Sequence, residues 1–368
     1  MANSFPPPLA HNVMHGFFPD LSWQIEDIAG NFRRQFGQDS THIVSNEELE
    51  KNKLKTKILK KAADNFIKKG YPPYQMADNV AILFQHLRYM VNFTLHRRKT
   101  FWIEESLAWM FHRTELDIEG ECLRLPFPSC LYVFSDAPSL ELATNVLQQD
   151  PDGDLQDETV KICSCYMNQI VFEDGASELE VNWLFDAQLP EWPYLLSRNL
   201  YIHPHDDLDT ILHSHCPDVA PENRDAIYTH PELKKLLHLA LSSVLYSTSA
   251  NLDMEVLESP ISSLEQQIAD SSRKRKIALK QKLHKMEKCY SKEDVFYLPG
   301  KIDISQYQAL SSMQKNDKSG VLNHRIMVRG HWRRANPSWH DQKLRWIMPF
   351  WKGSEDAPVI EKEYRLRP

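Results

Sequence analysis

Two stretches rich in β-branched and aromatic residues flank the dipeptide Asp174-Gly175, and this arrangement constrains the fold more than any other sequence feature. The stretches cover residues 160–172 and 179–185. An Asp-Gly pair between such runs is a strong hairpin signal, because glycine adopts the positive φ angles that tight hairpin turns need. The sequence therefore predicts a mainly antiparallel sheet within residues 120–216.

Helical patterns precede and follow this strand-rich region. Ser45 begins the sequence SNEE, in which serine and the glutamate three residues later can satisfy two free backbone donors at a helix start. Apolar side chains then recur at helical spacing in several segments. The fold class is therefore predicted to be α+β, with an N-terminal helical layer, a central mainly antiparallel sheet, a basic helix and a small C-terminal β region. Helices are expected at residues 22–36, 46–69, 76–98, 101–113, 230–247 and 262–288.

Changes in composition divide the chain into four predicted regions. Apolar runs stay well below the ~20 residues that cross a bilayer, and the N-terminus lacks the pattern of a signal peptide. The six cysteines are too sparse for a disulfide framework, so we expect reduced thiols in a cytoplasmic protein without membrane contact. The regions are an arm at 1–44, a helical region at 45–118, an α+β core at 119–260 and a basic region at 261–368.

The charge of the chain is divided unevenly along its length. Residues 273–352 contain 19 Lys+Arg and 6 Asp+Glu, a net +13, whereas the remainder contains 24 and 44, a net -20, and the two sum to -7. A basic part on an acidic body can face a polyanion such as nucleic acid. Alternatively, the two parts attract each other within one fold.

The C-terminal residues 324–352 interleave four tryptophans with arginines and lysines. Flat π-surface and positive charge together favour contact with nucleic acid. In the alternative interpretation, Trp346 and Met348 alternate along a strand and pack into a core. The residues predicted to contact nucleic acid are Arg273, Lys274, Arg275, Lys276, Arg329, His331, Trp332, Arg333, Arg334 and Arg345.

Part of this segment has the form of a known signature. Residues 328–333 read V-R-G-H-W-R, and residues 346–353 read W-I-M-P-F-W-K-G. The pair resembles a C-terminal signature of uncharacterised bacterial and mobile-element proteins. The resemblance implies a bacterial or phage origin, and it brings no catalytic residues. We expect a nucleic-acid-binding protein that acts in a bacterial defence, phage or toxin–antitoxin context.

A second short element would imply an enzyme. Arg198 begins the sequence RNLYIH, which resembles the R-x(4–6)-H element of HEPN-type ribonucleases. In that family the element lies on a helix, and the resemblance implies that Arg198 and His203 cleave RNA by general acid–base chemistry. Nearby prolines and the apolar residues at 195, 200 and 202 suit a strand equally well. The sequence thus leaves open whether the protein is an enzyme.

Histidines and acidic residues gather between positions 203 and 216. Imidazole, carboxylate and thiolate are ligands of transition metals, and two H-x-H pairs could hold a divalent ion if the segment between them turned back. An exposed polar loop is the alternative. The sequence contains no other cofactor motif. A third functional hypothesis is a protein-interaction module whose basic arm docks on an acidic protein partner. The candidate ligands are His203, His205, His213, His215 and Cys216.

Overall fold

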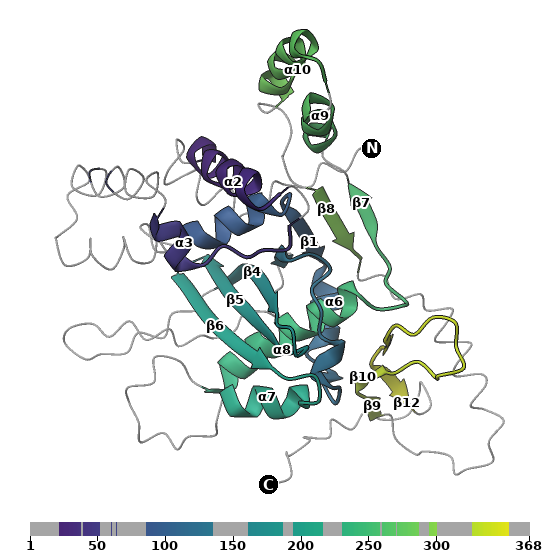
Figure 1. The fold of residues 1–368 in the computed structure, drawn as a ribbon. Coiled ribbons are helices and arrows are strands. Elements are labelled where there is room, and N and C mark those ends of the chain that lie inside the picture. The colour runs from purple at the N-terminus through teal and green to yellow at the C-terminus, as the bar shows by residue number, and fades with distance from the viewer. Residues whose placement is uncertain are drawn as a thin grey trace.

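A mixed sheet of seven described strands forms the centre of the computed structural model (Figure 1). The strand order is β6-β5-β4-β3-β1-β8-β7. The strands are β1 (Lys99–Ile103), β3 (Ser129–Phe134), β4 (Lys161–Val171), β5 (Ser177–Asp186), β6 (Tyr194–Ile202), β7 (Glu255–Leu257) and β8 (Asp294–Leu298). The structure describes residues 22–37, 40–51, 60, 64, 86–134, 161–186, 194–215, 230–257, 260–269, 271–286, 294–299 and 326–352.

Strand pairing confirms the predicted hairpin and the mainly antiparallel character of the sheet. Strands β3, β4, β5 and β6 pair antiparallel in sequence order. The β4–β5 turn contains Gly175 at a φ of 85°, the left-handed region that glycine enters without steric cost. Strand β1 runs parallel to β3 and β8, and β7 closes that edge antiparallel to β8.

One face of the sheet carries the apolar core. Alternating residues of β4, such as Cys165 and Met167, point to the same side as Trp183 of β5, and all three are fully buried. Helices α6 (Glu105–Phe111), α7 (Leu208–His215) and α8 (His230–Ser247) supply the apolar side chains that cover this face. The helix expected at residues 230–247 is confirmed as α8, and most of its described leucines are buried in this core.

The opposite face of the sheet is polar although it is equally buried. Tyr166 of β4 contacts aromatic rings of the helix at residues 86–95. Beside it, Arg88 of that helix pairs with Glu180 of β5 at 2.8 Å, and Nδ2 of Asn168 donates to the same carboxylate at 3.0 Å. Arg88 and Glu180 side chains are 8% and 5% exposed, so each charge depends on the other for compensation.

His86 gives this polar layer a pH dependence. Its imidazole is fully buried, neither ring nitrogen has a hydrogen-bond partner among the described residues, and burial lowers its pKa to about 4. Between pH 6.5 and 4 the unfolded chain therefore binds a proton that the folded chain does not, so stability falls as the pH falls. We expect His86 to account for a loss of about 2 kcal/mol between pH 7 and pH 5.

The His86→Phe variant tests this expectation. Urea unfolding of both proteins at pH 7 and pH 5 should show a smaller acid loss in the variant, by about 2 kcal/mol. Equal losses in the two proteins would mean that His86 titrates normally in the folded state.

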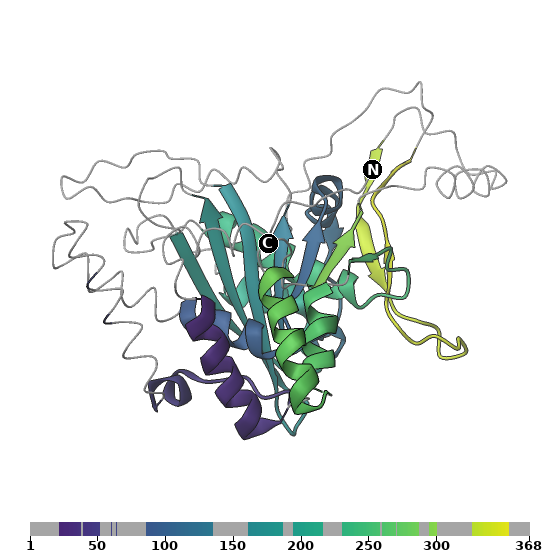
Figure 2. The same ribbon diagram turned by 90° about the horizontal axis from the view of Figure 1, so that it is seen from above.

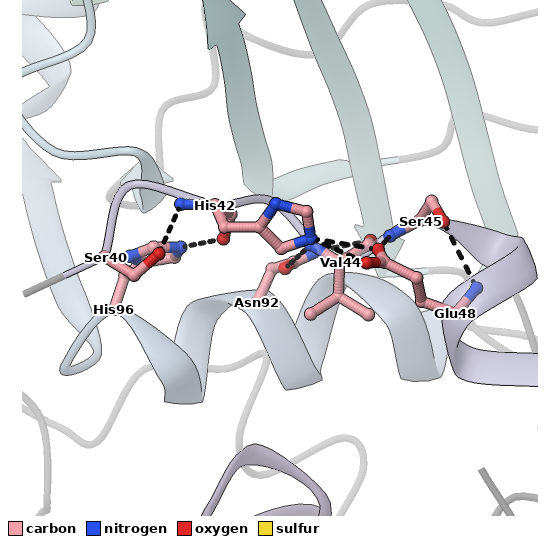
Figure 3. Close-up of polar contacts among 7 residues, drawn as sticks. All are labelled: Ser40, His42, Val44, Ser45, Glu48, Asn92 and His96. Atoms are coloured by element: carbon pink, nitrogen blue, oxygen red, sulfur yellow. Dashed lines mark hydrogen bonds and ion pairs between the residues drawn. The ribbon is translucent and has the colours of Figure 1, made fainter. Parts of the chain in front are cut away.

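Residues 40–51 form an N-terminal strap tied to the helix at residues 86–95 (Figure 3). Ser45 Oγ accepts from the backbone N–H of Glu48 at 3.2 Å, and the Glu48 carboxylate accepts from the backbone N–H of Ser45 at 2.8 Å. These reciprocal bonds confirm the predicted start of α3 (Asn46–Lys51). Buried Asn92 accepts from the N–H of Val44 and donates to its carbonyl, which fixes the strap to the helix.

The helical prediction for residues 101–113 is partly wrong. Only α6 is helical, and the preceding residues form β1. Thr100 and Phe101 are 0% and 2% exposed although they point to opposite faces. A strand buried on both faces lacks the alternating pattern that distinguishes strands from helices, so the sequence alone could not separate the two.

The single helix expected at residues 262–288 is two helices. These are α9 (Pro260–Ala269) and α10 (Arg273–Met286), which lie side by side (Figure 2). Ser271 Oγ donates to the carbonyl of Gln267 at 2.6 Å, and the carbonyl of Ser272 accepts the N–H of Lys276. A serine side chain such as that of Ser271 competes for backbone carbonyls and favours helix ends, so the chain turns between the two helices.

The remaining described elements complete the outline of the fold. Among the described helices, none combines the length and apolar character that a membrane crossing requires. The expected helix at residues 22–36 is confirmed as α2. The other elements are α2 (Ser22–Phe36), β2 (Thr114–Glu115), the 3-10 turn η1 (Gly120–Cys122), β9 (Ile326–Val328), β10 (Gly330–Arg333), β11 (Arg345–Ile347) and β12 (Phe350–Lys352).

Candidate nucleic-acid interface

Helix α10 is the most basic element of the described structure. Its 14 residues read RKRKIALKQKLHKM and include seven lysines and arginines with no acidic residue. Partial burial recurs at Lys276, Leu279, Leu283 and Met286, a spacing that defines one narrow stripe along a helix. Helix α10 packs alongside α9. Outside this stripe, the side chains of α10 that the structure describes are exposed.

The cations of α10 are not neutralised within the described part of the chain. Arg275, Lys280 and Lys282 are exposed, and none of them has an ion pair with a described carboxylate. Ile277 is also 62% exposed between them. The side chains of Arg273 and Lys274 lie outside the described set. Helix α10 is therefore a cationic surface on which no described carboxylate neutralises Arg275, Lys280 or Lys282.

The C-terminal tryptophans divide between the core and the surface. Trp332 and Trp346 are 5% and 3% exposed and belong to the main apolar core. Trp346 Nε1 donates to Thr114 Oγ1 at 3.0 Å, and its ring packs against Phe111 and Tyr246. The burial of Trp332 favours the packing interpretation over contact with nucleic acid, because a side chain packed in the core is poorly placed to stack on a base.

The glycine of the V-R-G-H-W-R signature also has a packing role. A Cβ atom at Gly330 would lie 2.7 Å from Thr114 Oγ1, 2.8 Å from Pro349 Cδ and 2.9 Å from the Ile347 carbonyl. These distances are shorter than van der Waals contact, so only glycine lets β10 approach its neighbours. In this fold, Gly330, Trp332, Trp346 and Pro349 attach the C-terminal strands to α6, α8 and β2.

Two of the predicted arginines are engaged by the acidic body of the same chain. Arg334 lies 2.9 Å from Glu119 and 3.5 Å from Glu121, and Arg329 lies 3.9 Å from Glu115. Such exposed pairs each contribute about 0–1 kcal/mol. They nevertheless favour internal charge attraction for this part of the basic region, which makes Arg329 and Arg334 weaker candidates for nucleic-acid contact than the residues of α10.

The outward face of β10 and β11 retains free cationic character. His331, Arg333 and Arg345 are exposed there, while the alternate positions hold the buried tryptophans. Trp339, which the sequence analysis did not select, lies beside both Arg333 and Arg345. Its position depends on how the connecting loop folds, a property that residue spacing alone does not give. Figures 1 and 2 both place this face apart from α10.

The structure contradicts the helical setting that the ribonuclease element requires. Arg198 lies within strand β6, and His203 follows the end of that strand. Five residues of extended chain span about 16 Å, and residues five apart point to opposite faces. This backbone setting does not support Arg198 and His203 as a catalytic pair and weighs against the ribonuclease hypothesis.

Helix α7 separates the two H-x-H pairs. His203 and His205 precede its first residue, and His213 and His215 lie in its last turn, about 8–10 Å from the start of the helix at 1.5 Å per residue. The side chains of His213 and His215 lie outside the described set. Asp206 and Asp207 accept backbone N–H groups of His203 and Thr210, so both act in local turns. The described residues hold no cluster of three potential ligands arranged for a metal ion. Cys216 lies outside the described residues.

Comparisons with known proteins find similarity only among solved structures, where two chains match. No protein-family model matches the sequence, and no curated protein matches it. Among solved structures, the chain is similar to one described as the crystal structure of AcrVA2, at 12% sequence identity and a TM-score of 0.47. The similarity covers 92% of this chain and 96% of that chain. Functional inference therefore rests on the residues of this chain.

Proposed function

We propose that this protein binds nucleic acid, with α10 as the principal contact. The observation that carries the proposal is the exposed, acid-free run of cations on α10. Polyanions bind such surfaces because each neutralised phosphate releases condensed counterions. The C-terminal signature supports a setting in bacterial defence, phage biology or a toxin–antitoxin system for this activity.

The geometry of α10 suits a phosphate backbone rather than the reading of bases. Fourteen residues at 1.5 Å each give a helix of about 21 Å, and its lysines and arginines are distributed around most of its circumference. Flexible lysine side chains make phosphate contacts that carry little sequence information. We therefore expect binding with weak sequence preference and strong salt dependence.

Charge removal on α10 tests the proposal. The Lys280→Gln/Lys282→Gln variant should bind a single-stranded RNA or a DNA duplex about tenfold or more weakly at moderate salt, because two phosphate contacts are lost. Fluorescence anisotropy with a labelled oligonucleotide measures the change.

Lys51→Gln/Lys235→Gln is the matched control for net charge. Both lysines are exposed and lie on α3 and α8 of the body. This control should retain wild-type affinity within about twofold, since its sites are remote from α10. Equal weakening in both variants would show that net charge, rather than α10, determines binding, and would refute the proposed site.

A further inference from the structure

Arg333 and Arg345 lie opposite each other on β10 and β11, an arrangement of like charges that does not stabilise the fold. They are direct partners in the antiparallel register, and both are exposed on the outward side of the strands. Like charges directly opposite one another destabilise a strand pair. The strand pairing therefore holds two positively charged guanidinium groups close together on one exposed surface.

Trp339 lies against both groups. The Cζ atoms of Arg333 and Arg345 are 5.2 Å and 4.6 Å from the centroid of its ring. An aromatic ring attracts cations through its quadrupole, so one half-buried indole holds two arginine side chains that would otherwise repel each other. Trp339 is thus a positioning residue for the pair.

The loop that carries Trp339 is fixed by its own hydrogen bonds. Asn336 Oδ1 accepts from the N–H and the hydroxyl of Ser338, and the carbonyl of Asn336 accepts the N–H of Trp339 at 2.8 Å. Gln342 Nε2 donates to the carbonyls of Asn336 and Trp339. The arrangement is therefore set before any ligand binds, which lowers the entropic cost of binding.

The pair lacks the internal carboxylates that engage its neighbours. Arg329 and Arg334 contact described glutamates, whereas no described carboxylate forms an ion pair with Arg333 or Arg345. Asp341 is the single acidic residue of the segment 326–352, and its Oδ1 accepts the backbone N–H of Lys343 at 3.0 Å. Among the described residues, no carboxylate neutralises these two positive charges, so the exposed pair is open to the approach of an anion.

We propose that Arg333 and Arg345 bind a dianionic phosphate monoester, the terminal phosphate of a nucleic-acid strand. Two planar guanidinium groups offer paired N–H donors to one phosphate, and two positive charges match the nearly doubly charged monoester better than the singly charged diester of an internal linkage. This inference rests on the proposed function, because the phosphate is that of a bound strand. It adds a second site, distinct from α10, that recognises strand ends.

Two oligonucleotides of one sequence test the inference, one carrying a 5′-phosphate and the other a 5′-hydroxyl, with a 3′-phosphorylated form as a third probe. Wild-type protein should bind one phosphorylated form about tenfold more tightly than the hydroxyl form, as charge-assisted hydrogen bonds imply. Arg333→Gln/Arg345→Gln should remove this preference. Trp339→Leu should reduce this preference without abolishing it, because the two arginines remain but lose the ring that positions them.

The same probes separate failure of this site from failure of the proposed function. Lys280→Gln/Lys282→Gln should weaken binding of all oligonucleotides and keep the preference for the phosphate. If no oligonucleotide binds, titration with inorganic phosphate decides: binding that is lost in Arg333→Gln/Arg345→Gln supports an anion site without the proposed function. Absence of phosphate binding, or equal affinity for phosphorylated and hydroxyl ends, overturns the inference.

Discussion

Replacing Trp346 by alanine is expected to lower the free energy of unfolding by about 3–5 kcal/mol, the usual cost of removing a buried tryptophan. The variant loses the ring contacts with Phe111 and Tyr246 and leaves Thr114 without its indole donor. Urea unfolding followed by far-UV circular dichroism measures the change.

Trp339→Ala is the control from the same segment. Trp339 is only half-buried and contacts two exposed arginines, so its removal should cost less than about 1 kcal/mol, as for most surface substitutions. If Trp346→Ala kept wild-type stability but lost nucleic-acid binding, Trp346 would be a contact residue and its assignment to the core would be wrong.

Removing Arg88 should have an effect of similar size for a different reason. Arg88→Met leaves the Glu180 carboxylate buried without its cation, and breaking such a pair costs about 3–5 kcal/mol. Most of this cost is the burial of an unpaired charge. Replacing both partners should therefore recover much of the loss.

The double variant Arg88→Met/Glu180→Leu makes that distinction. A double-mutant cycle from urea unfolding should give a coupling energy of more than about 2 kcal/mol between the two positions. Additive losses in the double variant would indicate that the side chains contribute through packing alone and that their charges are not coupled.

Local sequence signals were sufficient for elements whose structure depends on neighbouring residues. The capping box at Ser45 and Glu48 and the turn at Gly175 are formed by bonds within a few residues, so their patterns predict them directly. The apolar residues at 195, 200 and 202 suited a strand as well as a helix, and the structure forms the strand there as β6. Because residues 198–202 lie on this strand, the helix on which the ribonuclease element is placed in its family is not formed here.

The charge pairing and the burial of residues in the C-terminal region depend on long-range contacts, which residue spacing does not predict. Arg334 meets Glu119, and Trp346 meets Thr114, across more than two hundred residues of chain. The charge count predicted an eighty-residue basic block, but folding divides it into α10 and a C-terminal face that is partly neutralised by the body. Trp332 is buried and Trp339 is not, although both tryptophans lie beside arginines in the sequence. The side of β10 to which Trp332 points, and the conformation of the loop that carries Trp339, determine this difference.

The salt dependence of nucleic-acid binding tests the central claim most directly. For a DNA duplex, the slope of log K against log salt is about -0.9 per phosphate contact. We predict a steep decrease in wild-type affinity between roughly 50 and 200 mM salt, the range over which proteins with several phosphate contacts lose most of their affinity. In Lys280→Gln/Lys282→Gln the slope should be shallower by about 2. An affinity that does not change with salt, or a slope that is identical in wild type and variant, would contradict nucleic-acid binding through α10.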